Sequence, residues 1–208
     1  MAKPKIYHWS AAFRVQHWVH LAAIIALVIT GFYIHRPYIA GAEETMAWMR
    51  WVHLVAAYFL MFALVWRVYL MFNSQSAADW REILPLWRNL KHIPDIASYY
   101  LFMKNTHRHY HRYNPLQALA YTLMGLTVIC MVFTGFALHT GWLHAEFAWV
   151  NPLLGGLMYT RIVHYFGMWL LIVLSLVHLY FVIRQDALDG DRTLLSMIDG
   201  YCLREANE

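Results

Sequence analysis

Long apolar stretches alternate with polar segments along the whole chain. Four stretches are apolar over about 20 residues or more, the length that carries a helix across a bilayer. They cover residues of about 15–35, 48–72, 115–138 and 161–184. The pattern predicts an all-α integral membrane protein, a four-helix bundle that forms a single transmembrane domain over residues 1–208.

The composition supports this membrane assignment. Hydrophobic residues make up 61% of the chain and charged residues only 13%, against about 25% charged residues in soluble domains. Aromatic residues reach 17%, with 10 tryptophans, as expected for belts at the two membrane surfaces. The net charge of +4 requires no nucleic-acid partner, because Lys and Arg gather on the cytoplasmic side of membrane proteins.

The distribution of basic residues predicts how the chain crosses the membrane. The polar segment 73–114 contains many of them: Arg81, Arg88, Lys91, Lys104, Arg108 and Arg112. The loops 35–47 and 139–160 contain few. The positive-inside rule therefore places both termini and segment 73–114 in the cytoplasm, and the two loops on the outer side.

The last apolar stretch contains two histidines. His164 and His178 lie between Arg161 and Arg184, with no Asp, Glu, Lys or Arg among the intervening residues. At about 100° and 1.5 Å per residue, the two imidazoles lie within roughly 40° of one helix face and about 21 Å apart. Polar side chains at such depth are expensive and usually functional.

Two further histidines lie at matching depths on other spans. His53 starts the second span on the outer side, and His17 starts the first span on the inner side. Non-covalent b-type haem between helices takes one imidazole from each of two helices. The outer pair, His53 and His164, and the inner pair, His17 and His178, are therefore predicted haem-iron ligands. Alternatives are histidines that only hydrogen-bond to neighbouring helices, and His20 in place of His17.

The remaining cysteines and histidines are less suggestive of a metal site, although a zinc site among the cytoplasmic histidines is an alternative. Cys130 and Cys202 form no C-x-x-C-H motif, which excludes the usual covalent haem attachment and a thiolate metal site. His107, His109 and His111 alternate with other residues in the basic segment. We interpret them as a solvated or proton-handling surface rather than a metal cage.

Arginines and glycines accompany the candidate ligands. Arg14, Arg50 and Arg161 each lie three residues before one of them and are predicted to pair with haem propionates. The alternative is an ordinary arginine at a helix end. Gly31 and Gly135 are predicted to let a flat macrocycle approach the backbone, with small-residue helix packing as the alternative.

A weak internal repeat links the two halves of the chain. Thr-Gly-Phe occurs at residues 30–32 and 134–136, and Arg-x-Val-His at 50–53 and 161–164. The chain therefore reads as two similar helical hairpins, with His53 and His164 at equal depth near the outer surface.

A candidate quinone site lies at the cytoplasmic start of the third span. Asn114 and Gln117 carry amides that can hydrogen-bond to a quinone carbonyl. The same residues also suit a helix N-terminus, because Asn is a good N-cap and Pro115 follows it at the first helical position.

The chain resembles, over nearly its whole length, the b-type cytochrome subunit of membrane-bound nickel-iron uptake hydrogenases. These subunits belong to the prokaryotic dihaem cytochrome b superfamily. The segments that carry the resemblance are R-V-Q-H-W at 14–18, V-I-T-G-F at 28–32, R-W-V-H at 50–53, N-P-L-Q at 114–117, T-G-F-A-L at 134–138, H-Y-F-G-M-W at 164–169, V-H-L-Y at 177–180 and M-I-D-G-Y at 197–201. The resemblance implies two haem b groups held by His17, His53, His164 and His178, and it favours His17 over His20.

The resemblance also implies a function and partners. The partners would be a small iron–sulfur subunit and a large nickel-iron subunit on the periplasmic side of the inner membrane. Electrons would enter at the outer haem and leave to menaquinone or ubiquinone beside Asn114 and Gln117. The chain would anchor and complete a hydrogen:quinone oxidoreductase without a hydrogen-activating site of its own. Rival hypotheses are a formate dehydrogenase or thiosulfate reductase subunit, a stand-alone transmembrane haem reductase, and a membrane anchor with structural histidines.

Overall fold

Four long helices dominate the structure, a computed structural model that describes residues 4–38, 43–73, 80, 92–104, 113–141 and 143–203. These helices are long and apolar enough to cross a membrane: α1 (Ala11–His35), α2 (Glu43–Phe72), α5 (Pro115–Leu138) and α8 (Leu157–Asp189). The predicted all-α membrane fold with four spans is confirmed. The 33 residues of α8 reach about 50 Å at 1.5 Å per residue, which exceeds the hydrocarbon thickness of about 30 Å.

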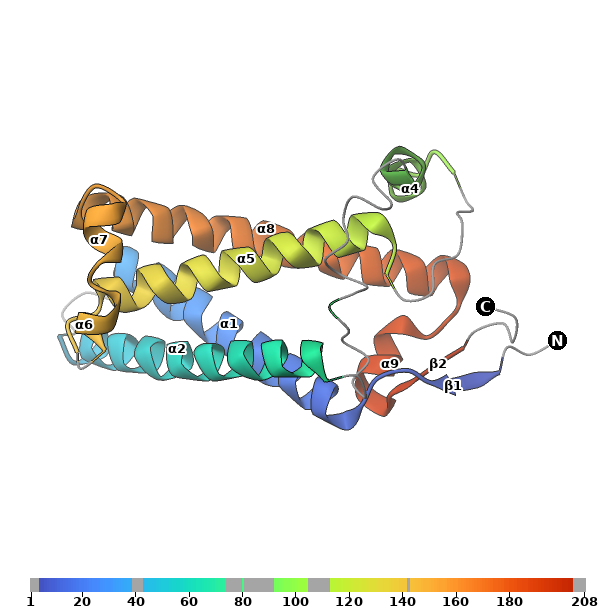
Figure 1. Ribbon diagram of the computed structural model, residues 1–208, viewed down its shortest axis with the longest axis horizontal. Helices are drawn as coiled ribbons and strands as arrows, with labels where there is room; N and C mark the ends of the chain where they lie inside the picture. The colour runs from blue at the N-terminus through green and yellow to red at the C-terminus, as the bar shows by residue number, and fades with distance from the viewer. Residues whose placement is uncertain are drawn as a thin grey trace. The chain divides into compact units, whose positions relative to one another are not determined.

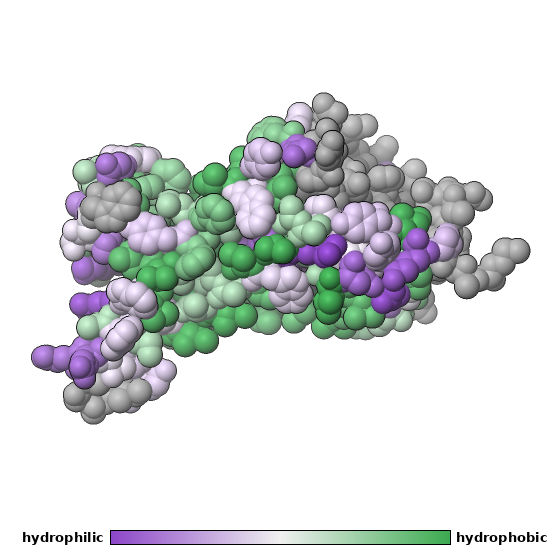
Figure 2. All heavy atoms as spheres, turned by 90° about the horizontal axis from the view of Figure 1, so that it is seen from below, coloured by the Kyte–Doolittle hydropathy of each residue, from purple (hydrophilic) through white to green (hydrophobic). Residues whose placement is uncertain are grey.

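The spans expose large apolar side chains. Phe62 of α2 is 60% exposed, and Phe166 and Leu176 of α8 are 64% and 61% exposed. Figure 2 shows hydrophobic side chains over much of the visible surface. Contiguous apolar surface of this kind marks an interaction with lipid or protein, and on helices of spanning length it is the surface that faces the bilayer.

Short elements connect or flank the spans. Helix α4 (Ile93–Tyr100) lies in the basic segment between α2 and α5, and α6 (His144–Phe147) and α7 (Val150–Leu153) lie between α5 and α8. After α8 come α9 (Thr193–Asp199) and strand β2 (Tyr201–Leu203), which pairs with β1 (Lys5–Tyr7).

The chain packs as two compact units, each described by itself. The first comprises Met1–Arg14, Tyr69–Thr127 and Leu170–Glu208. The second comprises Val15–Val68 and Val128–Trp169. Each unit thus contains a part of all four spans.

In the first unit, two side chains of α8 bind the end of α4. The Arg184 guanidinium donates from Nε and Nη2 to the Tyr99 carbonyl, at 3.0 and 2.6 Å, and the Tyr180 hydroxyl donates to the Tyr100 carbonyl. A cation at a helix C-terminus also interacts favourably with the helix dipole. Ile96, Tyr99 and Tyr100 are buried in a cluster with Phe181 of α8. Helix α4 is therefore attached to α8 by its apolar side chains and by its C-terminal carbonyls.

The two ends of the chain are joined in the same unit. Strands β1 and β2 pair antiparallel, with Ile6 opposite Cys202. The Trp9 indole N–H donates to Ser196 Oγ at 3.1 Å, across 187 positions of sequence. Gly200 ends α9 with φ of 88°, and a Cβ there would collide with the Arg14 guanidinium. This turn therefore requires glycine.

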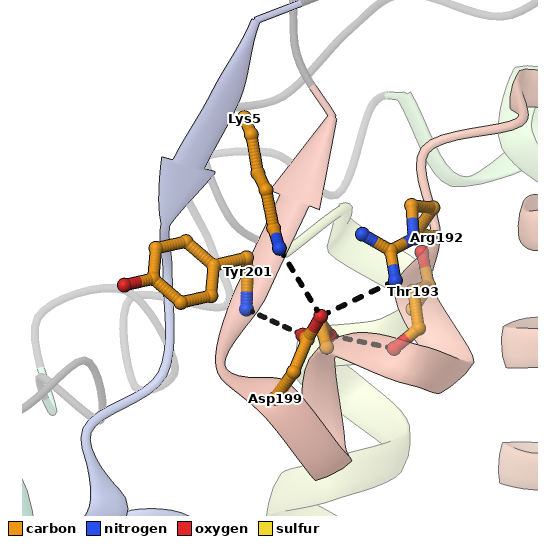
Figure 3. Close-up of polar contacts among 6 residues, drawn as sticks. Lys5, Arg192, Thr193, Asp199 and Tyr201 are labelled. Carbon is orange, nitrogen blue, oxygen red and sulfur yellow. Dashed lines mark hydrogen bonds and ion pairs between the residues drawn. The ribbon is translucent and has the colours of Figure 1, made fainter.

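Asp199 links the elements of this terminal pairing. Its carboxylate accepts the Tyr201 backbone N–H at 2.9 Å and lies 3.2 Å from Arg192 Nη2 and 3.6 Å from Lys5 Nζ (Figure 3). The Tyr201 N–H first, and then the charges of Arg192 and Lys5, lower the pKa of Asp199 below its usual value.

The terminal pairing should weaken in acid. Because the folded pKa of Asp199 is depressed, its stabilisation is present above the unfolded pKa, near 3.9, and is lost as the pH falls through the lower folded value. Asp199→Asn should therefore speed hydrogen exchange of the Tyr201–Leu203 amides roughly a few-fold at neutral pH, because exposed ion pairs are weak. Hydrogen-exchange mass spectrometry measures this. Glu146→Gln, on α6 of the other unit, is the control, and equal exchange in both variants would contradict the assignment.

Candidate functional site

Two histidines of the second unit make the same contact with a threonine of the preceding span. The distance from His53 Nδ1 on α2 to Thr30 Oγ1 on α1 is 2.8 Å. The distance from His164 Nδ1 on α8 to Thr134 Oγ1 on α5 is also 2.8 Å. The Thr-Gly-Phe and Arg-x-Val-His repeats of the sequence therefore meet within each hairpin.

The threonine hydroxyls determine which ring nitrogen carries the proton. Thr30 donates its hydroxyl hydrogen to the Ala26 carbonyl at 2.6 Å, and Thr134 donates to the Cys130 carbonyl at 2.7 Å. Each hydroxyl has only one hydrogen, so its oxygen accepts from the imidazole. Both rings therefore carry hydrogen on Nδ1 and a lone pair on Nε2, the form in which imidazole binds a metal.

The glycine after each threonine makes room for the ring. A Cβ on Gly135 would lie 3.1 Å from His164 Cε1, closer than ordinary contact. A Cβ on Gly31 would lie 3.6 Å from both His53 Cε1 and Met168 Sδ. The two glycines thus adjoin imidazole rings, and Gly135 is the more restrictive. Their predicted contact with a macrocycle stays a prediction.

Aromatic contacts also join the four spans within the second unit. The rings of Phe32 on α1 and Trp169 on α8 lie 5.4 Å apart, and those of Tyr58 on α2 and Phe136 on α5 lie 5.2 Å apart.

Two imidazoles suit an iron that is held mainly by a porphyrin. Among the residues that the structure describes, no group of three or more His, Cys, Asp or Glu side chains could hold a bare metal ion. A haem iron needs only two axial ligands from the protein. The prepared Nε2 lone pairs of His53 and His164 fit that requirement.

The three predicted propionate partners have different surroundings. Arg50 and Arg161 are exposed on α2 and α8, one turn before His53 and His164. Arg14 donates to the Trp9 carbonyl at 2.7 Å in the first unit. Pairing of all three with propionates stays a prediction.

The predicted inner ligands lie in different units. His17 on α1 belongs to the second unit and His178 on α8 to the first. The His178 ring lies edge-on to the Tyr121 ring of α5, at a centroid distance of 5.3 Å. The pairing of His17 with His178 stays a prediction.

His20 is prepared differently from the outer histidines. Gln16 Nε2 donates to the Ala63 carbonyl at 3.1 Å and lies 3.4 Å from His20 Nδ1. An amide nitrogen only donates, so His20 Nδ1 accepts and its neutral ring carries hydrogen on Nε2. The nitrogen that binds haem iron is then occupied, which favours His17 as the inner ligand.

Asn114 and Gln117 form a reciprocal cap at the start of α5. Asn114 Oδ1 accepts the Gln117 backbone N–H at 2.8 Å, and Gln117 Oε1 accepts the Asn114 backbone N–H at 3.1 Å. Both residues are buried. This is a capping box, so the alternative interpretation as a helix N-cap is confirmed and both amide oxygens are engaged.

The amide nitrogens of this cap converge on Tyr100. Asn114 Nδ2 donates to the Tyr100 hydroxyl oxygen at 2.9 Å, and Gln117 Nε2 donates to it at 3.3 Å. Gln117 Nε2 also donates to Gln185 Oε1 at 2.9 Å, and Gln185 Nε2 donates to Asp191 at 3.0 Å. The carboxylate of Asp191 can only accept, and this orients the two glutamine amides in turn.

The Tyr100 hydroxyl is thereby left as a donor. Its oxygen accepts two N–H groups, and within the described part of the chain its hydrogen has no acceptor. Burial raises the pKa of Tyr100 well above its usual value, so the hydroxyl keeps its hydrogen. His107, His109 and His111, predicted to handle protons, lie outside the described residues.

The comparison with known families decides the class of protein. A sequence model of the prokaryotic cytochrome b561 family matches residues 8–200. The chain belongs to the prokaryotic cytochrome b561 family. It is therefore a multi-pass membrane cytochrome of the haem b class with a role in electron transport.

Similar cytochromes of this family are found in several bacteria. The chain is 30% identical to a probable Ni/Fe-hydrogenase B-type cytochrome subunit of Cupriavidus necator, over 94% of this chain and 86% of the relative. A protein of the same name from Azotobacter vinelandii is 30% identical over 94% and 88%. A probable Ni/Fe-hydrogenase 1 B-type cytochrome subunit of Escherichia coli K12 is 26% identical over 94% and 89%.

Three residues of this cytochrome escaped the sequence analysis. Thr30 and Thr134 were visible as members of the Thr-Gly-Phe repeat, but only their spatial contact shows that they bind the imidazoles. Tyr100 lies 14 positions from Asn114. The helical spacing of Ile93, Ile96 and Tyr100 could have indicated the buried face of α4, but not the contact with Asn114.

The inner ligand of the cytochrome can be identified by substitution. If the predicted inner haem is bound, His17→Ala should remove it and His20→Ala should keep it, because the His20 ring carries its hydrogen on Nε2. Reduced-minus-oxidised absorption spectra of the purified variants measure the number of haems. Loss of a haem from His20→Ala with retention in His17→Ala would reverse the assignment.

Proposed function

We propose that this protein is the dihaem cytochrome b subunit that anchors a periplasmic nickel-iron hydrogenase to the inner membrane and passes its electrons to the quinone pool. The observation that carries the proposal is the outer pair, His53 and His164, with both Nε2 lone pairs prepared for iron. The names of the similar proteins, which are hydrogenase B-type cytochrome subunits, supply the partner. The small iron–sulfur and large nickel-iron subunits would be that partner.

The roles of the chain in this proposal are to bind, orient and separate two redox groups. Haem b supplies one-electron chemistry when it is bound. His53 and His164 would hold the outer group, and His17 and His178 the inner one, with Arg14, Arg50 and Arg161 near the propionates. Because α8 carries a ligand of each pair, one helix would set the separation of the two groups.

Charge distribution supports the orientation of this circuit. The basic segment 73–114 favours a cytoplasmic location for itself and both termini. The outer histidines would then face the periplasmic hydrogenase, and the start of α5 would face the cytoplasmic surface. Inward movement of electrons across the low-dielectric layer stores energy, at about 2.3 kcal/mol per charge and 100 mV.

The proposed quinone site lies at Asn114 and Gln117, and Tyr100 is its hydrogen-bond donor. The two amides are engaged in the cap of α5 and in holding Tyr100. The Tyr100 hydrogen and the second hydrogen of Asn114 Nδ2 are therefore the donors that remain to meet a quinone carbonyl. Proton uptake from the cytoplasm would follow on this side, and His107, His109 or His111 is proposed to take part.

The relatives favour a hydrogenase over the other candidates. None of the similar proteins named above is a formate dehydrogenase, thiosulfate reductase or stand-alone reductase subunit. A membrane anchor without redox groups would not need imidazoles with prepared Nε2 lone pairs. Purification in mild detergent, followed by identification of every bound chain and metal, tests the proposed partners.

The purified chain should contain two haem b groups. Four histidines provide two axial pairs, and without a covalent attachment motif both groups should be extractable. A pyridine haemochrome assay against protein concentration gives the ratio. His53→Ala and His164→Ala should each reduce the ratio from two to one. A ratio of one in the unchanged protein would contradict the four-ligand assignment.

Tyr100→Phe should slow quinone reduction while both haems remain. Loss of one hydrogen bond to a buried group costs about 1–3 kcal/mol, which predicts a decrease of roughly tenfold to 100-fold. Stopped-flow mixing of the reduced cytochrome with decylubiquinone or menadione measures the rate. Tyr69→Phe, at an exposed position of α2, is the matched control. Equal rates in both variants would exclude Tyr100 as the donor.

Replacement of Asn114 and Gln117 by apolar residues also tests the quinone site. It is less specific, because it removes the cap of α5 as well.

A further inference from the structure

The threonine of each Thr-Gly pair does more than pack its helix. We propose that Thr30 and Thr134 are positioning residues for the outer haem, which fix the tautomer and ring orientation of His53 and His164 and so set the affinity and reduction potential of that haem. The inference rests on the proposed function, because it presumes that these histidines bind iron. It assigns a role to two residues outside the ligand set.

The hydrogen bonds leave each ring little freedom. Thr30 is 3% exposed and Thr134 is 1% exposed, so water does not compete for either hydroxyl. A ring rotated away from its threonine would leave a buried N–H without an acceptor, which is costly in a low-dielectric interior. The 2.8 Å contact therefore selects one orientation of His53 and one of His164.

The acceptor chosen for each imidazole also affects its strength as a ligand. A hydrogen bond from Nδ1 raises the basicity of the ligating nitrogen. Here the acceptor is a neutral hydroxyl, which is itself polarised by donating to the Ala26 or Cys130 carbonyl. Both imidazoles would be strengthened as ligands in this way, since each Nδ1 lies 2.8 Å from its threonine hydroxyl.

The adjoining glycines limit where the ring can go. At Gly135 a Cβ would lie 3.1 Å from His164 Cε1, so the ring lies close against the backbone on that side. The Thr134 hydroxyl holds Nδ1 of the same ring. Thr134 and Gly135 together define the position of His164. At Gly31 a Cβ would lie at an ordinary contact distance of 3.6 Å from His53 Cε1, so the Thr30 hydroxyl alone sets the position of His53.

Other threonines show that the bond to the helix carbonyl is not the decisive feature. Thr122 and Thr127 of α5 also donate to the carbonyl four residues earlier, at 2.9 and 2.8 Å. Within the described residues, neither hydroxyl hydrogen-bonds to a histidine. Thr127 is buried like Thr134 and lies on the same helix, so Thr127→Val is a matched control for Thr134→Val.

Valine and serine variants separate the hydroxyl from the shape of the side chain. Thr134→Val keeps the shape and removes the acceptor, so the affinity for the outer haem should fall about tenfold to 100-fold. The reduction potential of that haem should rise, because a less basic ligand stabilises the oxidised iron less. Each tenfold difference between the ferric and ferrous affinities corresponds to about 59 mV. Thr134→Ser keeps the acceptor and should restore both properties, and Thr127→Val should change neither.

The readouts are haem content after dialysis against apomyoglobin, redox titration and the low-spin electron paramagnetic resonance signal of the outer haem. Thr30→Val and Thr30→Ser repeat the comparison at His53 and decide the question if Thr134→Val fails to fold. The inference is overturned if the valine variants match Thr127→Val, or if the serine variants behave like the valine variants. If His53→Ala and His164→Ala do not remove a haem, the proposed function fails instead.

Discussion

The hydrogen bonds between two threonines and two histidines organise the second of the two compact units. An imidazole N–H inside a membrane protein needs an acceptor, because lipid offers none. Thr30 and Thr134 supply it at 2.8 Å, and both hydroxyls have already given their hydrogens to their own helices. Each pair of helices is thereby joined at the histidine of its second helix, and the Nε2 of that histidine carries a lone pair.

Hydrogen bonds whose direction is fixed by one partner also occur elsewhere in the molecule. Gln16 gives His20 the opposite tautomer from that of the outer histidines. Asp191 orients Gln185 and Gln117, and among the described residues the hydrogen of Tyr100 then has no acceptor. Arginine and tyrosine side chains of α8 hold α4 in place. In each case a group that can only donate or only accept fixes the polarity of its neighbours.

Features that depend on local pattern were predictable from the sequence. Hydropathy over about 20 residues identified the four spans, although α1 begins at Ala11 and α8 continues to Asp189, beyond the expected limits. The Thr-Gly-Phe and Arg-x-Val-His repeats placed His53 and His164 at equivalent positions of two hairpins, and in the structure each ring contacts the threonine of its own hairpin. The Asn-Pro pair correctly indicated the start of α5, because capping is a local interaction.

Contacts between distant segments were not predictable in the same way. The Thr30–His53 and Thr134–His164 contacts join residues 23 and 30 positions apart, and the role of the Thr-Gly-Phe repeat depends on how the helices pack. The pairing of β1 with β2 joins the two ends of the chain, and three-residue strands leave no periodic signal. Tyr100 was missed because its role comes from α5 and α8 rather than from its own neighbours.

The proposed binding of haem iron by His53 and His164 can be tested by direct observation of the iron ligands. A cryo-electron microscopy map of the detergent-purified protein, with bound haem, would show which atoms approach the iron. We expect iron between Nε2 of His53 and Nε2 of His164. Nδ1 of His53 should still lie within hydrogen-bond distance of Thr30, and Nδ1 of His164 within hydrogen-bond distance of Thr134. Iron bound through Nδ1, iron bound to another residue, or imidazoles turned away from the threonines would contradict it.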